Sequence, residues 1–140
     1  MKPVELHITS EPARLGEVRE AVAKLAREVG FAQDTVDRMV LAVDEALCNV
    51  IKHGYKGERG RPIELTFDAE LEPGRVGLEI RVRDYGCQVD PNVIRGRDLG
   101  EVRPGGLGVH IIRSLMDEVE YALADGGGMC LRMRKYLVRE

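Results

Sequence analysis

Apolar residues alternate with polar ones at the start of the chain and then change to a helical spacing. Residues 4–8 alternate strictly, which predicts a short strand. Between residues 15 and 29 the apolar positions recur every three or four residues, so one face of a helix is apolar. We expect Ser10 to cap the N-terminus of this helix, with Pro12 in its first turn, and Gly30 to end it.

The next apolar run follows the same helical spacing. A second helix is predicted to begin near Asp34 and to end near Gly54, before the loop-like run GYKGERGRP. Apolar and polar residues then alternate over residues 63–69 and again over residues 76–82, with a turn at residues 72–74 between them. This pattern predicts a β-hairpin.

The last third of the chain combines a long polar segment with three further elements. Residues 84–106 contain prolines and glycines and little periodicity, and a loop of that length in a compact domain is usually functional or mobile. A helix is predicted from Val109, followed by strands over residues 119–123 and 129–133. The order predicts one domain over residues 1–140, an α+β two-layer sandwich whose mixed, mostly antiparallel sheet carries helices on one face.

The charge balance narrows the classes of function. Lys and Arg number 21 against 24 Asp and Glu, a net charge of -3. A direct nucleic-acid platform would show a basic patch, so we expect no such binding.

The cysteines and the hydropathy point to a cytoplasmic protein. Cys48, Cys87 and Cys130 are odd in number and far apart, which favours reduced thiols over disulfides or zinc. The N-terminal residues lack the apolar core of a signal peptide, and no stretch is long enough to span a bilayer.

Two polar residues on the second predicted helix are candidates for chemistry. Glu45 and Asn49 lie four residues apart and so project from the same face. They form either a solvated polar face or a functional pair, in which the carboxylate accepts a proton and the amide oxygen holds Mg²⁺. Asp44 is also available, so acidity alone does not single out Glu45.

Two further features are ambiguous when each is taken alone. Asp84 follows an apolar strand and precedes Gly86, as in an ordinary turn or in a pocket that accepts the exocyclic amine of adenine. The run Gly105 to Gly108 leads into a helix, either as flexible punctuation or as a phosphate cradle of backbone N–H groups. It has no P-loop signature.

The three features together, in this order, resemble the boxes of the GHKL superfamily, the Bergerat ATPase fold shared by gyrase, histidine kinases and MutL-type proteins. DEALCNVIKHGY is similar to its N-box, RDYGCQ to its first glycine box and GGLGVHII to its second. The EAxxN–xxxHxY run and GGLG followed by IIRSLMDEV favour the anti-sigma-factor serine/threonine-protein kinases. The similarity covers nearly the whole chain.

The resemblance implies a role for each residue. Glu45 is the general base toward a serine hydroxyl, Asn49 ligates Mg²⁺, and Asp84 with Gly86 receives the adenine of ATP or ADP. The phosphates contact the second glycine box, which consists of Gly105, Gly106, Leu107 and Gly108.

Residues 88–104 correspond to the ATP lid, and two positions near its ends need separate comment. Gln88 stands where the first glycine box often has a second glycine. Arg103 is a candidate for neutralising the transferred phosphate, although Pro104 and Gly105 separate it from Gly106.

The resemblance also implies partners. They are a STAS-domain anti-sigma-factor antagonist as phosphorylation substrate, a sigma factor, a PP2C-type phosphatase in the same circuit, and a second copy in a homodimer. A non-catalytic, nucleotide-gated switch module is the alternative, since it would need Asp84 and the glycine run but not Glu45 as a base. A histidine-kinase catalytic fragment is disfavoured, because no phospho-accepting helical hairpin precedes the domain.

Overall fold

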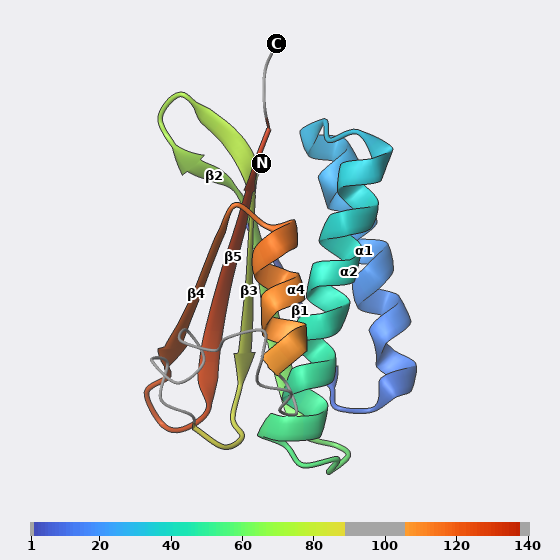
Figure 1. The fold of residues 1–140 in the computed structure, drawn as a ribbon, viewed down its shortest axis with the longest axis vertical. Helices are drawn as coiled ribbons and strands as arrows, with labels where there is room; N and C mark the ends of the chain where they lie inside the picture. The colour runs from blue at the N-terminus through green and yellow to red at the C-terminus, as the bar shows by residue number, and fades with distance from the viewer. Residues whose placement is uncertain (1, 89–105, 138–140) are drawn as a thin grey trace.

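The computed structural model describes residues 2–88 and 106–137 (Figure 1). Apart from Gln88, the expected lid lies outside the described residues. The elements in chain order are β1 (Val4–Thr9), the 3₁₀ turn η1 (Pro12–Arg14), α1 (Leu15–Val29), α2 (Gln33–Asn49), η2 (Val50–Gly54), β2 (Pro62–Glu72), β3 (Arg75–Asp84), α4 (Gly106–Leu115), β4 (Glu118–Leu123) and β5 (Met129–Tyr136).

The five strands form one sheet in the order β1-β2-β3-β5-β4. Each neighbouring pair is antiparallel, so the expected α+β sandwich is confirmed but the described part of the sheet is not mixed. β3 and β4 run in the same direction, and α4 lies between them in the chain, so the two strands could have formed a parallel pair. β5 lies between them instead, which makes both contacts antiparallel.

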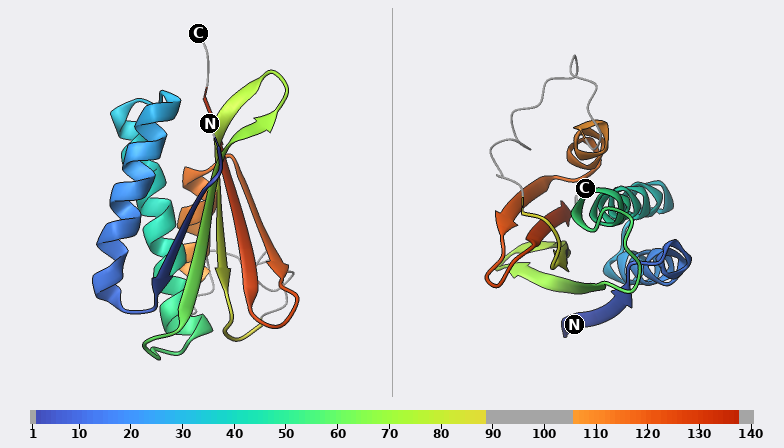
Figure 2. Two further views of the ribbon diagram at one scale, coloured as in Figure 1. Left: turned by 180° about the vertical axis from the view of Figure 1, so that it is seen from behind. Right: turned by 90° about the horizontal axis from the view of Figure 1, so that it is seen from below.

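The three α-helices cover one face of this sheet, with α2 packed against both α1 and α4 (Figures 1 and 2). The strands alternate as the sequence predicts, because every second side chain points to the helical layer. The core is closed by the buried residues of β2 and β3, namely Ile63, Leu65, Phe67, Leu78, Ile80 and Val82, against the apolar faces of the helices.

The uncovered face of the sheet carries charged residues instead. Glu79 on β3 lies opposite Arg134 on β5, and Arg81 lies opposite Arg132. Glu79 is only 6% exposed and accepts hydrogen bonds from Arg81 and Arg134. The charge of Glu79 is therefore balanced by arginines of the same sheet.

The boundaries of α1 are explained by two different residues. Gly30 ends the helix as predicted, with a φ of 116° and its N–H bonded to carbonyls of the last turn. The prediction that Ser10 is the N-cap is wrong, because η1 separates Ser10 from α1. Its Oγ donates to the Glu58 carbonyl at 2.7 Å and accepts the Arg61 N–H at 3.1 Å, which fastens the loop before β2.

The second predicted helix ends where expected but not with a regular turn. α2 is α-helical to Asn49, and η2 continues it as a π-helical turn in which the Tyr55 N–H bonds to the Val50 carbonyl at 2.8 Å. Such turns insert one extra residue into a helix and are frequent at functional sites.

The helix predicted from Val109 begins three residues earlier, at Gly106. Gly106, Leu107 and Gly108 therefore belong to the first turn of α4 and not to a loop before it. None of the helices within residues 2–88 and 106–137 has the length and apolar character that crossing a membrane requires.

Candidate functional site

Four segments that are far apart in sequence come together at one end of the molecule. They are the end of η2, the end of β3, the turn between β4 and β5, and the start of α4, all at the lower end in Figure 1. Two contacts join the first three of these segments: Cys87 N–H donates to the Gly54 carbonyl at 2.9 Å, and Met129 N–H donates to Asp84 Oδ1 at 3.3 Å.

Asp84 is the central side chain of this corner. It is 4% exposed, and its Oδ1 accepts N–H groups from Gly86 at 2.9 Å and from Met129. No described residue donates to Oδ2. Burial raises the pKa of the Asp84 carboxyl, and the two backbone N–H groups offset this only in part. One oxygen is thus committed to the backbone, and the other can accept from a ligand.

Two glycines let the backbone approach this carboxylate closely. A Cβ on Gly86 would lie 2.3 Å from the Gly54 carbonyl oxygen, and one on Gly128 would lie 2.0 Å from the Asp84 carbonyl oxygen. Gly86 is therefore required by the contact between the end of β3 and the end of η2. Its expected role was to make room for the base, and the structure adds this packing reason.

The turn between β4 and β5 braces Asp84 from the other side, which sequence reasoning missed. The Arg83 guanidinium donates to the carbonyls of Asp84, Asp125 and Gly127 at 2.6–2.8 Å. Gln88 Nε2 donates to the carbonyls of Ala124 and Gly128 at 3.1 and 3.0 Å. At the position where the first glycine box often has a glycine, Gln88 therefore forms hydrogen bonds to this turn. The available sequence signal was the run DGGG, whose three glycines all have positive φ.

Asp44 and Glu45 differ in their described neighbours. Successive residues of an α-helix are rotated by about 100°, so these two side chains leave α2 on different flanks. Asp44 Oδ1 pairs with Arg19 Nε of α1 at 2.7 Å. No described side chain forms an ion pair or hydrogen bond with Glu45. Glu45 is therefore the available carboxylate.

Asn49 lies one turn beyond Glu45 and has an unsatisfied amide. Its Nδ2 is buried and has no hydrogen-bond partner within residues 2–88 and 106–137. An orphaned buried donor costs about 1–3 kcal/mol, which a phosphate oxygen in contact with it would recover. The amide oxygen of the same side chain is a ligand of the type that Mg²⁺ prefers.

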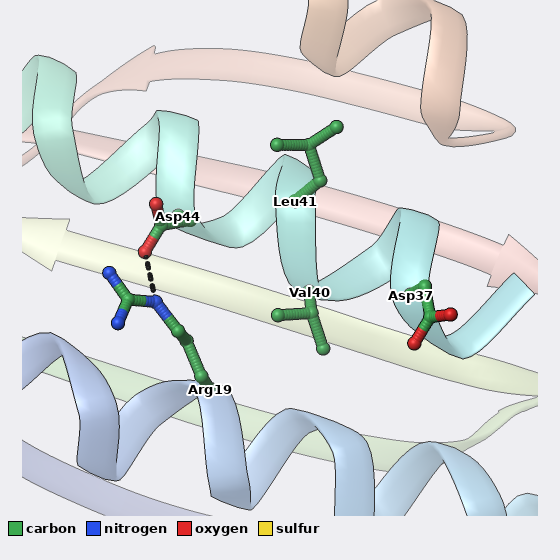
Figure 3. A pocket seen from close by; sticks show the side chains of 5 residues that line it. All are labelled: Arg19, Asp37, Val40, Leu41 and Asp44. Atoms are coloured by element: carbon green, nitrogen blue, oxygen red, sulfur yellow. Dashed lines mark hydrogen bonds and ion pairs between the residues drawn. The ribbon is translucent and has the colours of Figure 1, made fainter. Parts of the chain in front are cut away.

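A separate pocket of about 360 Å³ lies between α1 and α2 (Figure 3). Arg19, Asp37, Val40, Leu41 and Asp44 line it, and the Arg19–Asp44 pair bridges the two helices there. None of the predicted site residues lines this pocket. Its position on the α1 flank of α2 separates it from Glu45 and Asn49.

The start of α4 supplies the remaining part of the site. The first turn of a helix has N–H groups without intrahelical partners and the positive end of the helix dipole, which suits phosphate. Gly106, Leu107 and Gly108 occupy that turn. Gly105 and Arg103 lie outside the described residues.

The donor set fits a magnesium–nucleotide complex better than a metal held by the protein alone. No group of three or more His, Cys, Asp or Glu able to hold a metal occurs in the described part of the chain. Mg²⁺ bound with a nucleotide takes most of its ligands from phosphates and water, so a single amide oxygen is sufficient.

Comparison with known proteins assigns nearly the whole chain to one family. A family model described as a histidine kinase-like ATPase domain matches residues 8–135. The serine-protein kinase RsbW of Bacillus cereus is 30% identical over 145 residues, which cover 98% of this chain and 86% of the relative. The serine-protein kinase RsbW of Bacillus pumilus is 31% identical over 146 residues, covering 98% and 87%.

Because the matching solved structures have low sequence identity to this chain, they support the fold alone. A crystal structure of the RsbU and RsbW domains of a Mycobacterium tuberculosis protein matches the whole chain with a TM-score of 0.70 and 17% identity. This chain spans 34% of that one. A blue-light activated histidine kinase of Erythrobacter litoralis matches 88% of the chain with a TM-score of 0.53 and 20% identity, and the match covers 40% of the kinase.

Proposed function

The chain belongs to the histidine kinase-like ATPase domain family and is related to the serine-protein kinases RsbW, and on this premise we propose that it is an ATP-dependent protein serine kinase that also acts as an anti-sigma factor. The observation that carries the proposal is the presence in one chain of two carboxylates: Asp84 is buried with one oxygen bound by backbone N–H groups, and Glu45 on α2 has no hydrogen-bond or ion-pair partner among the described residues. The first suits adenine recognition, and the second suits proton removal.

Each residue then has a defined task. Asp84 Oδ2 accepts the exocyclic amine of adenine, while the first turn of α4 donates backbone N–H groups to the phosphates. Asn49 donates from Nδ2 to a phosphate oxygen and offers its amide oxygen to Mg²⁺. Bound Mg²⁺ neutralises phosphate charge, and the protein positions the reacting groups. Glu45 accepts the proton of the attacking serine hydroxyl, which accelerates transfer by about 10²- to 10⁴-fold in enzymes of this type.

The partners form part of the same proposal. The substrate is a serine on a STAS-domain antagonist, and the anti-sigma activity requires a sigma factor as the alternative partner. We place the protein in the cytoplasm as a homodimer, in a circuit that includes a PP2C-type phosphatase. Sedimentation of the purified chain measures the dimer directly.

The test of the kinase is phosphoserine formation on a STAS-domain antagonist with ATP and Mg²⁺. Glu45→Ala should lower the transfer rate at least about 100-fold. Asp44→Ala is the matched control, because it removes the adjacent carboxylate that is paired with Arg19, and we expect it to change the rate less than about threefold. Equal losses in the two variants would contradict the role of Glu45.

A non-catalytic switch module remains the second candidate, because none of the hydrogen bonds around Asp84 among the described residues involves Glu45. If wild-type protein binds ATP but transfers no phosphate to any antagonist, and if nucleotide alters its binding to the sigma factor, this second function replaces the first.

A further inference from the structure

Tyr55 occupies an unusual position between the two halves of the site. It follows η2 directly and is 3% exposed. Its hydroxyl donates to the Pro62 carbonyl at the start of β2 and accepts the Tyr85 N–H at 2.8 Å. The phenol oxygen thus serves as donor and acceptor at once, and a phenylalanine could do neither.

These bonds connect the helix that carries Glu45 and Asn49 to the segment that carries Asp84. Tyr85 is the next residue after Asp84, so its N–H belongs to the peptide that Asp84 itself begins. A second bond runs parallel to this one, from Cys87 N–H to the Gly54 carbonyl at 2.9 Å. The absence of a side chain at Gly86, between them, allows the two backbones to touch.

Arg61 completes the connection. Its guanidinium lies over the Tyr55 ring, 4.7 Å from the centroid, and donates to the Tyr85 carbonyl at 3.2 Å. Both backbone polar groups of Tyr85 are therefore hydrogen-bonded, the N–H to Tyr55 and the carbonyl to Arg61. The peptides on both sides of Tyr85 have little freedom to rotate.

We propose that Tyr55 is a positioning residue that holds Asp84 in the orientation needed to recognise adenine and couples that subsite to the end of α2. The inference rests on the proposed nucleotide function and adds a determinant of base selectivity to it. A binding group held before the ligand arrives avoids the ordering cost that would otherwise weaken binding. Without the hydroxyl, the Tyr85 N–H loses its partner and the Asp84 peptide gains freedom.

The test is the Tyr55→Phe variant in the full chain, with ADP and GDP as probes and calorimetry as the measurement. We expect ADP affinity to fall about tenfold, since the Tyr85 N–H beside Asp84 loses its hydrogen bond, and GDP affinity to change less than about twofold. The adenine preference then falls about tenfold. Tyr136→Phe is the matched control, because its buried hydroxyl bonds to Glu118 on the uncovered face of the sheet. It should lower thermal stability without altering the preference.

Two results overturn the proposal. The first is a Tyr55→Phe protein that loses stability but keeps the wild-type preference for ADP over GDP. The second comes from hydrogen exchange on the wild type, which does not depend on the variant folding: the Tyr85 and Cys87 amides should already be protected without nucleotide, and protection that arises only with ADP contradicts a prebuilt connection. A wild type with no preference for ADP would instead refute the adenine site itself.

Discussion

Strand β3 carries two buried carboxylates that the fold treats in opposite ways. Glu79 lies on the uncovered face of the sheet, where Arg81, Arg132 and Arg134 have nitrogens 2.8–3.6 Å from its oxygens. Asp84 lies on the opposite side at the end of the same strand and contacts only backbone N–H groups among the described residues. Both side chains are nearly inaccessible, so burial alone does not distinguish them.

The direction of the pKa shift separates the two. Burial alone would raise the pKa of Glu79, but hydrogen bonds from Arg134 and Arg81 outweigh it and hold the pKa below the ordinary value. Burial raises the pKa of Asp84, and no cation reverses the effect. A carboxylate surrounded by arginines is fully used by the fold, whereas one buried with no cationic hydrogen-bond partner among the described residues marks a candidate site.

The largest expected effect comes from Asp84→Asn. The amide oxygen can still accept the N–H groups of Gly86 and Met129, but the second oxygen becomes an NH₂ donor that faces the donor amine of adenine. We expect ADP affinity to fall at least about 300-fold, from the lost charged hydrogen bond and the new unpaired donors. Calorimetry measures the affinity, and thermal unfolding should show unchanged or slightly higher stability. A large loss of stability would assign Asp84 a structural role like that of Glu79.

Glu79→Ala should produce the reverse pattern. Removing the shared carboxylate leaves three arginines without their central partner and should lower the free energy of unfolding by about 3 kcal/mol, measured in urea. ADP affinity should stay within about twofold of wild type. Glu17→Ala, which breaks the exposed pair with Arg14, is the control and should cost at most about 1 kcal/mol. Equal costs for the two variants would contradict the role of burial.

Two glycines of the turn between β4 and β5 test whether this turn supports Asp84. Gly126 and Gly128 both have positive φ, so alanine strains the backbone at either position. Only at Gly128 does the new Cβ meet the Asp84 carbonyl, at 2.0 Å, whereas nothing lies within 4 Å at Gly126. We expect Gly128→Ala to cost about 2 kcal/mol more than Gly126→Ala in urea unfolding and to weaken ADP binding about tenfold. Identical behaviour of the two would show that the turn does not brace Asp84.

The smallest effect is the pH dependence of stability, which has opposite signs for the two carboxylates. Because the pKa of Asp84 is raised, the contribution of this carboxyl to the free energy of unfolding declines as pH rises from about 3.9 through the folded value. The stability of Asp84→Asn relative to the wild type should therefore grow with pH. The lowered pKa of Glu79 means that its contribution is full above about 4.3 and is lost as pH falls through the folded value.

Urea unfolding between about pH 3 and pH 7 measures both trends. Each group contributes at most about 1.4 kcal/mol per pH unit. The wild-type advantage over Glu79→Gln should shrink on acidification. Parallel curves for the wild type and the two variants would remove the distinction between the carboxylates.

Much of the fold follows from local pattern. Alternation located all five strands, and three- and four-residue spacing located the three α-helices, because each pattern reflects one element packing on one core. Exact ends were less predictable. Ser10 resembled an N-cap but bonds to Glu58 and Arg61, 48 and 51 residues away, and α4 begins at Gly106 although glycine disfavours helix.

The candidate site was predictable as a set of residues but not as a set of contacts. The three boxes named Glu45, Asn49 and Asp84, yet acidity alone did not single out Glu45 over Asp44. That preference depends on Arg19, which lies on another helix. Tyr55 and Gln88 gained a role only when their hydrogen-bond partners, 30 to 40 residues away, were known.

The sequence by itself determined the elements, their apolar faces and the chemistry available at each box. The tertiary structure alone decided which buried carboxylate is neutralised by arginines and which, in the described part of the chain, is bound by backbone N–H groups alone. The physical reason is that periodicity encodes the face on which a side chain lies, while the energy of a buried charge depends on what lies opposite it. For Glu79 and Asp84 the deciding partners named here both come from β5, Arg134 in one case and Met129 in the other.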